Sequence, residues 1–482
     1  MLGRESIKEK TAKGLLWSGL SNSLQQLLGL VFGIILARKL SQTDYGIVGM
    51  LTIFSAIAAC LQEGGFIAAL NRKKDVTRAD YNAVFWMSIS ISLFFYLLFF
   101  FTAPLIARFY DEPRLVSLAR YTFLSFLFVS FSIAPRAYIF RNMMVRQSSI
   151  ISLASLALSG IVGVIMAYLG FAYWGLATQS IVFTLTVSVL NFWYSGWRPS
   201  LNIDLRPIRE LFGFSSKLIV TSIVTAINGN MISVLLGKYY SATEVGNFTQ
   251  ANKWNTMGHS LITSMLYNVA QPILTKADGD MVRQKKIFRK LLRFTAFVSF
   301  PAMLCLALIS EEFIVILITE KWLPSAHLLR ILCIAGTVMP ISYLFSNLLI
   351  SRGRSDAYMW CTIVFCLAQL AGMLLCVPYG IETMVTVFVI INILWMLVWF
   401  WFSCREIDLH FSEAVRDISP YLILSVSIVA VAYYLTSGMS NIYLSVVTKV
   451  VFVFSVYGAA LWLLGSTIFK ETVLFITKKI IE

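Results

Sequence analysis

The sequence predicts an all-α, polytopic membrane protein with about 14 transmembrane helices, and three features support this fold class. First, 58% of the 482 residues are hydrophobic and 13% are charged, whereas soluble domains carry about 45–50% apolar and about 25% charged residues. Second, apolar runs follow one another along almost the whole chain. Third, basic residues collect in every second break between these runs. This composition excludes a soluble domain, a disordered chain and a secreted disulfide scaffold.

The apolar runs give the helices in chain order, as two sets of six followed by two more. The first set covers 12–37, 45–66, 83–107, 116–139, 149–170 and 173–195. The second set covers 213–237, 245–274, 293–318, 327–350, 357–377 and 380–402, and the last two helices cover 419–436 and 443–468. Each run approaches or exceeds the roughly 20 residues that cross a bilayer core of about 30 Å.

The lysine and arginine residues give the orientation. With the N-terminus in the cytoplasm, 29 of the 39 fall in breaks on the cytoplasmic side and eight on the outer side. Because this asymmetry follows the positive-inside rule, the net charge of +15 is mainly a signal of topology. Nucleic acid is therefore not an expected partner. Both termini are expected in the cytoplasm.

The breaks and the cysteines limit the chemistry. No break is long enough for a folded extramembrane domain, so the chain is expected not to be an enzyme, and no catalytic residue is assigned. The first apolar run is too long for a cleavable signal peptide. The seven cysteines form no CxxC pair, so neither a disulfide framework nor a metal site is expected.

A stretch at the end of the first helix recurs 200 residues later. Residues 36–46 read LARKLSQTDYG and residues 236–246 read LGKYYSATEVG. Both contain Ser-x-x-acid, a capping box, and independent capping of two helices would also explain the match. The equal spacing of six helices favours a repeat, and two parallel halves are typical of transporters. The predicted organisation is a first lobe at 1–197, a second lobe at 198–404 and two additional helices at 405–482.

Polar side chains inside the spans concentrate in the first two helices of each set. On the first helix of each set they share one face: Ser18, Asn22, Gln25 and Gly29, then Ser222, Thr225, Gly229 and Ser233, with Asn230 alongside. The eighth helix is the most polar and carries Asn247, Gln250, Asn252, Lys253, Asn255 and His259. Such residues either line a wet cavity or join helices, at about 0.6–2 kcal/mol per contact.

Three ionisable residues are singled out within these helices. Lys253 lies about eight residues into its helix, ~12 Å from the outer end, so it is expected to meet an anion or a wet cavity. Glu63 lies near the inner end of its helix and either couples an ion or pairs with Arg72 or Lys73. His259 is either a proton carrier or a satisfied polar contact.

Several stretches carry a family resemblance. They are ARKLSQTDYG at 37–46, GGFIAAL at 64–70, ARFY at 107–110, PRAY at 135–138, WRP at 197–199 and GNF at 246–248. In this order, across the first twelve helices, they resemble the bacterial polysaccharide flippases of the O-antigen type. That family belongs to the multidrug/oligosaccharidyl-lipid/polysaccharide exporter superfamily.

The resemblance implies that the chain flips isoprenoid-diphosphate-linked oligosaccharide from the cytoplasmic to the periplasmic leaflet of the inner membrane by alternating access. The product would enter lipopolysaccharide, exopolysaccharide or capsule biosynthesis. A diphosphate requires cations and sugar hydroxyls require amides. The expected substrate-binding residues are Lys253, Arg136, Arg141, Asn22, Gln25, Asn230 and Asn252. No cofactor is expected apart from coupling to H⁺ or Na⁺, and the expected partners besides the substrate are membrane lipid and a glycan polymerase of the same pathway.

The chain also departs from the family pattern. Relatives often carry an arginine at the position of Gln250 and an acid near Ile232, so Glu63 and His259 are the remaining candidates for ion coupling. Two other classes stay open at this point. A cation-coupled drug exporter of the same superfamily would prefer an acidic cavity, and a membrane glycan polymerase or ligase would need a larger loop.

Overall fold

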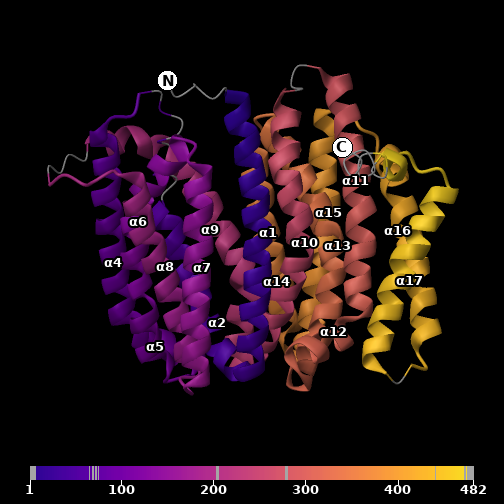
Figure 1. Ribbon diagram of the computed structural model, residues 1–482, viewed down its shortest axis with the longest axis horizontal. Helices are drawn as coiled ribbons and strands as arrows, with labels where there is room; N and C mark the ends of the chain where they lie inside the picture. Colours follow the sequence, from indigo (N-terminus) through magenta and orange to yellow (C-terminus); the bar gives the residue numbers. More distant parts are fainter. Residues whose placement is uncertain are drawn as a thin grey trace. The chain divides into compact units, whose positions relative to one another are not determined.

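The computed structural model describes residues 7–63, 66–67, 70, 73, 75–201, 206–276, 280–439, 441–471 and 474. All regular secondary structure in this part of the chain is helical (Figure 1), and thirteen of the described helices are long and apolar enough to cross a membrane. The eighth predicted span is the 35-residue helix α10 (Ala242–Lys276), which is long enough but too polar to meet that criterion. The predicted all-α polytopic fold is confirmed.

The chain forms two compact units, Met1–Gly246 and Asn247–Glu482. The helices of the first unit are α1 (Ile7–Lys39), α2 (Gln42–Glu63), α4 (Arg78–Tyr110), α5 (Leu115–Thr122), α6 (Leu124–Arg141), α7 (Val145–Tyr168), α8 (Tyr173–Ser195) and α9 (Arg206–Tyr239). Helix α10 begins at the end of this unit and continues in the second. The lobe boundaries predicted at 197 and 404 remain predictions.

In the first unit, α4, α6, α8 and α7 stand side by side (Figure 1), and α1 packs on α7 while α9 packs on α2. An aromatic cluster joins the start of α4, the middle of α6 and the chain after α8. The Phe85 and Trp197 rings lie 5.5 Å apart, and the Tyr81 and Tyr138 rings lie 5.7 Å apart. This cluster packs the end of the first unit that carries Arg136 and Arg141, the two residues of α6 that are predicted to bind the diphosphate.

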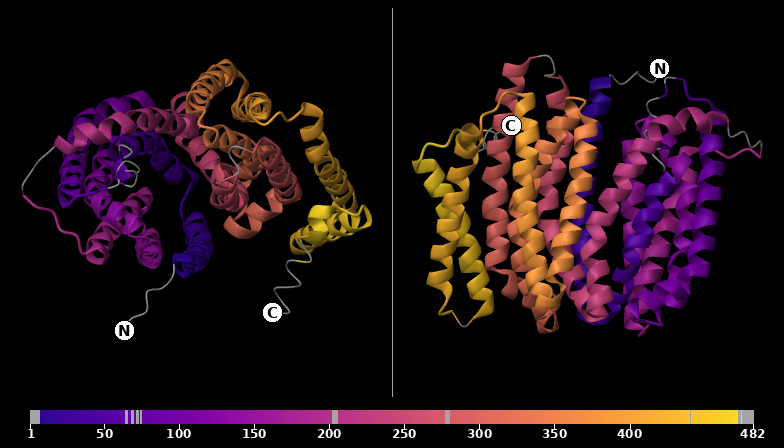
Figure 2. Two further views of the ribbon diagram at one scale, coloured as in Figure 1. Left: turned by 90° about the horizontal axis from the view of Figure 1, so that it is seen from above. Right: turned by 180° about the vertical axis from the view of Figure 1, so that it is seen from behind.

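The second unit continues with α11 (Met281–Leu308), α12 (Ser310–Ile318), α13 (Leu323–Ser351), α14 (Ser355–Cys376), α15 (Ile381–Glu406), α16 (Phe411–Thr436) and α17 (Ile442–Leu463). Its core gathers around α11 and α13, where Phe288, Phe300 and Phe345 are almost completely buried. Helices α16 and α17 form an antiparallel pair (Figure 2), and α16 packs along α11.

Three predicted helices differ from the structure. The span predicted at 116–139 is two helices, because the chain breaks at Phe123, whose ring packs against Phe54, Phe99 and Phe126. The span predicted at 293–318 begins earlier, at Met281, and breaks at Ile309. The last helix ends at Leu463 instead of 468, because Gly465 takes a left-handed φ of 69°, a conformation that ends helices.

The two copies of the repeat lie in contact. In the first copy the capping box is confirmed, because the Ser41 main-chain N–H donates to Asp44 Oδ2 (2.9 Å) and the Asp44 N–H donates to Ser41 Oγ (3.2 Å). The hydroxyls of Thr43 and Thr243, 200 residues apart, are 3.0 Å from each other. A Cβ at Gly46 would collide with the main-chain oxygen of Ala242, and one at Gly246 with that of Gln42. Only glycine permits this reciprocal approach.

Candidate functional site

Helix α1 presents two accessible sides of opposite character. The apolar side is spaced i, i+4, i+7, i+11 and is 39% to 59% exposed, with Leu20, Leu24, Leu27 and Val31. The polar side carries Asn22, which is exposed, and Gln25, whose amide donates to Ser21 Oγ (3.0 Å). A Cβ at Gly29 would meet nothing within 4 Å. In a membrane, the apolar side suits lipid and the polar side requires water or a polar ligand.

Helix α9 repeats this arrangement in part. Ser222, Thr225 and Gly229 are exposed along one stripe, as the sequence predicts, whereas Ser233 is buried. The predicted sugar ligand Asn230 is half-buried, and its amide donates within the helix to the Ala226 carbonyl (2.8 Å). Its side-chain oxygen remains the group that could accept from a sugar hydroxyl.

Helix α10 carries a polar stripe around Lys253, beside accessible apolar residues that include Leu261 and Met265. Five side chains at i, i+3, i+4, i+7 and i+11 are exposed or half-buried: Thr249, Asn252, Lys253, Thr256 and Ser260. Asn252 and Lys253 are predicted from the sequence, whereas the three hydroxyl residues are not. Their helical spacing around Lys253 is the signal that would have found them. A stripe of hydroxyls, an amide and a lysine is costly to place against lipid chains.

The opposite side of α10 packs into the second unit. Asn247 accepts a hydrogen bond from the Ser325 hydroxyl (3.3 Å), and Asn255 is 2% exposed with its side-chain oxygen facing the Cα of Gly336, where a Cβ would not fit. Gln250 is fully buried. His259 has its Nδ1 enclosed, with no hydrogen-bond partner among the described residues. Asn252, Lys253 and His259 are all half-buried, and the Nδ1 atom of His259 is enclosed.

Lys253 stands without an acidic partner in the described part of the chain. Its Nζ lies 5.6 Å from the centroid of the Trp254 ring, and no carboxylate pairs with it. Since α10 begins at Ala242, eleven residues precede Lys253 in the helix, so it lies ~16 Å from that end, deeper than the sequence suggests. A cation at this depth requires water or an anion.

Glu63 and Arg136 lie together. Arg136 Nη1 donates to Glu63 Oε1 at 3.0 Å, between the end of α2 and α6, with side chains 59% and 47% exposed, respectively. The structure therefore pairs Glu63, one of the two ion-coupling candidates, with Arg136, one of the residues predicted to bind the diphosphate. Lys73, one of the two predicted partners of Glu63, pairs with Asp80 (2.9 Å). Arg72, the other predicted partner, lies outside the described residues.

Arg141, the second diphosphate candidate on α6, contacts the main chain. Its Nη1 donates to the carbonyl oxygens of Leu70 (2.6 Å) and Lys73 (2.8 Å). The guanidinium thereby anchors the segment that follows α2. The role of Arg141 toward substrate stays a prediction, and in this structure its contacts are those of an anchoring residue.

A further ion pair lies within the helices of the second unit. Lys449 of α17 pairs with Glu312 of α12, and the Ser445 hydroxyl donates to the same carboxylate oxygen (3.2 Å). Lys449 is therefore neutralised locally. Among the described residues, no group of three or more His, Cys, Asp and Glu side chains could hold a metal ion.

The fold and these polar stripes define the class: a multi-pass membrane protein that keeps accessible amides and hydroxyls within its long helices, together with Lys253, which has no acidic partner among the described residues. Comparison with known families narrows this class. A family described as "Polysaccharide biosynthesis protein" matches residues 35–327, more than half of the chain. The chain belongs to this family, and the resemblance to the polysaccharide flippases is confirmed.

Individual relatives agree with this membership. The teichuronic acid biosynthesis protein TuaB of Bacillus subtilis (strain 168) is 25% identical over 443 residues, 87% of either chain. The lipopolysaccharide biosynthesis protein WzxC of Escherichia coli (strain K12) is 24% identical over 358 residues, 73% of this chain and 72% of the relative. In fold, the chain is similar to the lipid II flippase MurJ in an inward closed conformation, with a TM-score of 0.78, 14% identity and coverage of 93% and 99%.

Proposed function

We propose that this protein is a non-enzymatic transporter that flips isoprenoid-diphosphate-linked oligosaccharide from the cytoplasmic to the periplasmic leaflet of the inner membrane. The observation that carries the proposal is the polar stripe of α10 at Thr249, Asn252, Lys253, Thr256 and Ser260, in which Lys253 has no acidic partner among the described residues. The names of the relatives TuaB and WzxC, both biosynthesis proteins for surface glycans, support a glycan as cargo.

The chemistry of such a cargo matches the side chains available. A sugar–diphosphate head group cannot cross about 30 Å of hydrocarbon unaided. In the second unit, Lys253 supplies a cation for the diphosphate and Asn252 an amide for a sugar. In the first unit, Asn22, Gln25 and Asn230 carry amides of the same chemistry. The isoprenoid chain needs no polar surface and stays in the lipid. A binding surface exposed to each side of the membrane in turn would move the head group between leaflets.

The Glu63–Arg136 pair supplies a proposed route for ion coupling. With Glu63 ionised, Arg136 is neutralised by it and attracts a diphosphate weakly. A proton or Na⁺ on Glu63 would release Arg136 to hold the diphosphate, so that loading of the ion and of the substrate favour one another. His259 stays a second coupling candidate, and its Nδ1 is enclosed within the protein.

The test is leaflet-resolved accumulation of lipid-linked oligosaccharide in cells depleted of the protein. We expect precursor to accumulate on the cytoplasmic face, to be cleared by the wild-type protein, and to persist with Lys253→Ala. The matched control is Lys238→Ala, since Lys238 Nζ also lies near an aromatic ring (5.2 Å from Phe109) but has an acid nearby, Asp111 at 3.8 Å.

The outcomes are separable. Clearance by Lys238→Ala but not by Lys253→Ala supports a flippase with a cationic site on α10. Precursor that reaches the periplasmic face in depleted cells and stalls there unpolymerised would contradict the flippase and indicate a later step of glycan assembly. Clearance by Lys253→Ala at the wild-type rate would leave the flippase standing but remove Lys253 from its site.

A further inference from the structure

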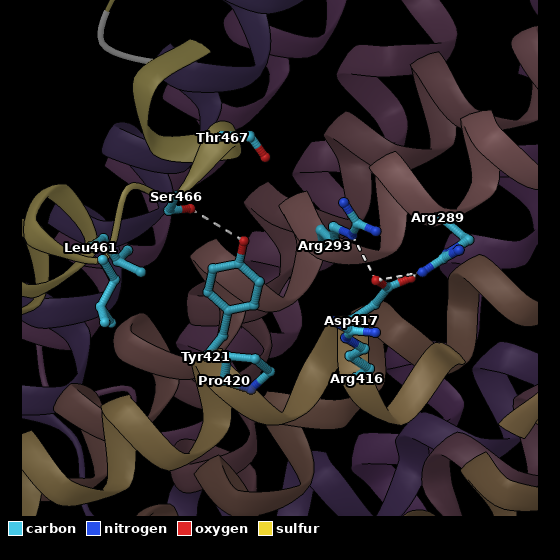
Figure 3. A pocket seen from close by; sticks show the side chains of 10 residues that line it. Arg289, Arg293, Arg416, Asp417, Pro420, Tyr421, Leu461, Ser466 and Thr467 are labelled. Atoms are coloured by element: carbon cyan, nitrogen blue, oxygen red, sulfur yellow. Dashed lines mark hydrogen bonds and ion pairs between the residues drawn. The ribbon is translucent and has the colours of Figure 1, made fainter. Parts of the chain in front are cut away.

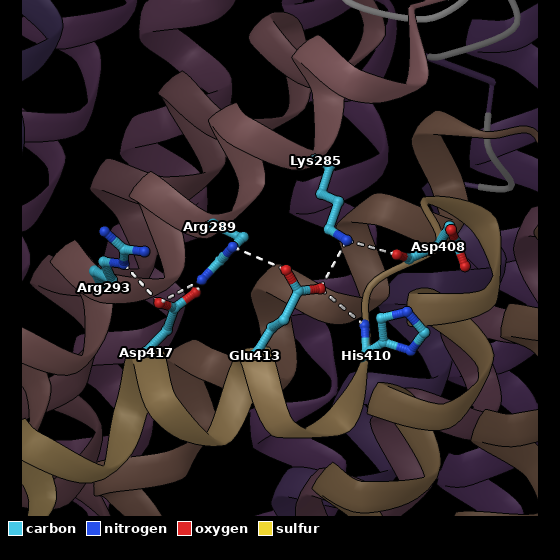
Figure 4. A network of polar contacts seen from close by, with 7 residues as sticks. All are labelled: Lys285, Arg289, Arg293, Asp408, His410, Glu413 and Asp417. Atoms are coloured by element: carbon cyan, nitrogen blue, oxygen red, sulfur yellow. Dashed lines mark hydrogen bonds and ion pairs between the residues drawn. The ribbon is translucent and has the colours of Figure 1, made fainter.

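A network of charges joins α11 to α16 within the second unit (Figure 4). Asp417 is the centre of this network, with a side chain only 3% exposed. Its carboxylate accepts the Nε–H of Arg289 (2.6 Å) and the Nε–H of Arg293 (2.7 Å). Glu413, one turn earlier, accepts from Arg289 Nη1 (3.0 Å) and pairs with Lys285 (2.6 Å). Two arginines are thus held in fixed positions by a buried acid.

Cations outnumber acids in this region. Six basic side chains line it: Lys285, Lys286, Arg289, Lys290, Arg293 and Arg416. The acids that pair with them are Glu413, Asp417 and Glu471. Arg416 has no acidic partner among the described residues, and the terminal amino groups of Arg293 have none either. The excess positive charge therefore lies on guanidinium groups that can bind an anion.

A pocket of about 540 Å³ lies beside these guanidinium groups (Figure 3). Arg289, Arg293 and Arg416 line one part of it, and the hydroxyls of Tyr421 and Ser466, 3.5 Å apart, line another. A neighbouring pocket of about 440 Å³ shares Arg289 and Arg293. Ligand pockets usually measure about 300–1,000 Å³, so the first pocket has room for a small anionic head group.

The same pocket is apolar on the side of α17. Leu461, which is buried, and Leu464, which is 72% exposed, line it there, and the adjacent Leu463 is 85% exposed. An anion that occupied the arginine side would therefore lie next to a surface suited to hydrocarbon. This combination distinguishes a phospholipid from a soluble anion, because a soluble anion makes no use of exposed leucines at the mouth of its pocket.

We propose that this pocket binds the phosphodiester head group of an anionic glycerophospholipid, with an acyl chain along Leu461 and Leu464. Guanidinium groups match phosphate oxygens in geometry. The pocket lies at the end of the spans where basic residues concentrate, which the positive-inside rule assigns to the cytoplasm. Basic pockets between transmembrane helices on that side are typical sites for anionic head groups. Asp417 also lines the pocket, and we assign it a positioning role because it holds both Arg289 and Arg293.

The test is equilibrium binding of phosphatidylglycerol with a fluorescent acyl chain to the full-length protein in neutral detergent. Arg416→Gln and Arg293→Gln are the informative variants. Replacing Arg416 leaves no acid unpaired, and when Arg293 is replaced Asp417 still accepts two hydrogen bonds from Arg289. Loss of one charged hydrogen bond to phosphate should weaken binding about tenfold. Arg283→Gln is the matched control, since Arg283 lies on α11, is exposed and lines neither pocket.

Each outcome bears on the proposal. Weaker binding in Arg416→Gln and Arg293→Gln but not in Arg283→Gln, with unchanged melting temperatures, supports it. Equal binding of phosphatidylcholine with the same acyl chain, or equal weakening by Arg283→Gln, would overturn it. Competition by glycerol 3-phosphate as strong as by phosphatidylglycerol would indicate a soluble-anion site, and stronger competition by an isoprenoid diphosphate would indicate a substrate site. Because binding alone is measured, the result is independent of transport.

Discussion

Two lysines within the helices of the second unit have opposite surroundings. Lys449 is 10% exposed and is paired with Glu312, itself 17% exposed and also bound by the Ser445 hydroxyl. Lys253 lies on a polar, accessible face and pairs with no carboxylate among the described residues. Both lysines look alike in the sequence, as single cations in long helices.

The difference separates a structural cation from one available to a ligand. A buried lysine that has an acid beside it is neutralised within the fold, and breaking the pair should lower the stability of the protein. A lysine on an accessible polar face is solvated or bound by an anion, and its removal should weaken the binding of that anion. The Glu63–Arg136 pair, which is accessible to solvent on both partners, lies between these two cases.

The largest effect on stability is expected from Glu312→Gln. This change leaves the Lys449 cation buried without its acid, which should lower the free energy of unfolding by about 3–5 kcal/mol. The double variant Glu312→Gln/Lys449→Met should recover most of the loss, because it removes both charges. Denaturant unfolding in mild detergent measures both. A single variant as stable as the wild type would remove the distinction between the two lysines.

A smaller effect is expected from Glu63→Gln. The ion pair with Arg136 is about half exposed, so its loss should change the free energy of unfolding by less than about 1 kcal/mol. The same unfolding measurement tests this. A loss comparable with that of Glu312→Gln would mean that the pair is shielded from water and acts as a structural contact.

The smallest effect on stability is expected from Lys253→Met. No acid is left unpaired by this change, and substitutions away from packed or paired sites usually stay within about 0.5 kcal/mol. The melting temperature should match the wild type even where clearance of lipid-linked precursor fails. A clear loss of stability would assign Lys253 to the folded core and would weaken its proposed role toward diphosphate.

Much of the fold follows from the sequence because hydropathy reports solvent preference directly. The apolar runs gave a helix at every predicted span, and the repeat at Ser41–Asp44 predicted a capping box that the structure confirms. The helix breaks at Phe123 and Ile309 could not be predicted, because both residues are apolar and continue the pattern. Such breaks are set by packing between helices and leave no mark in the order of polar and apolar residues.

The candidate site divides in the same way. The sequence by itself determined which helices carry polar residues, because amides and a lysine in a 35-residue helix are conspicuous in an apolar chain. Only the tertiary structure decided which of them remain accessible. It buried Asn255, engaged Arg141 with two carbonyls and paired Lys449 with an acid 137 residues away, while Lys253 remained accessible. The physical reason is that a side chain carries its charge in any fold, whereas the packing of helices that are distant in sequence determines which partner it contacts.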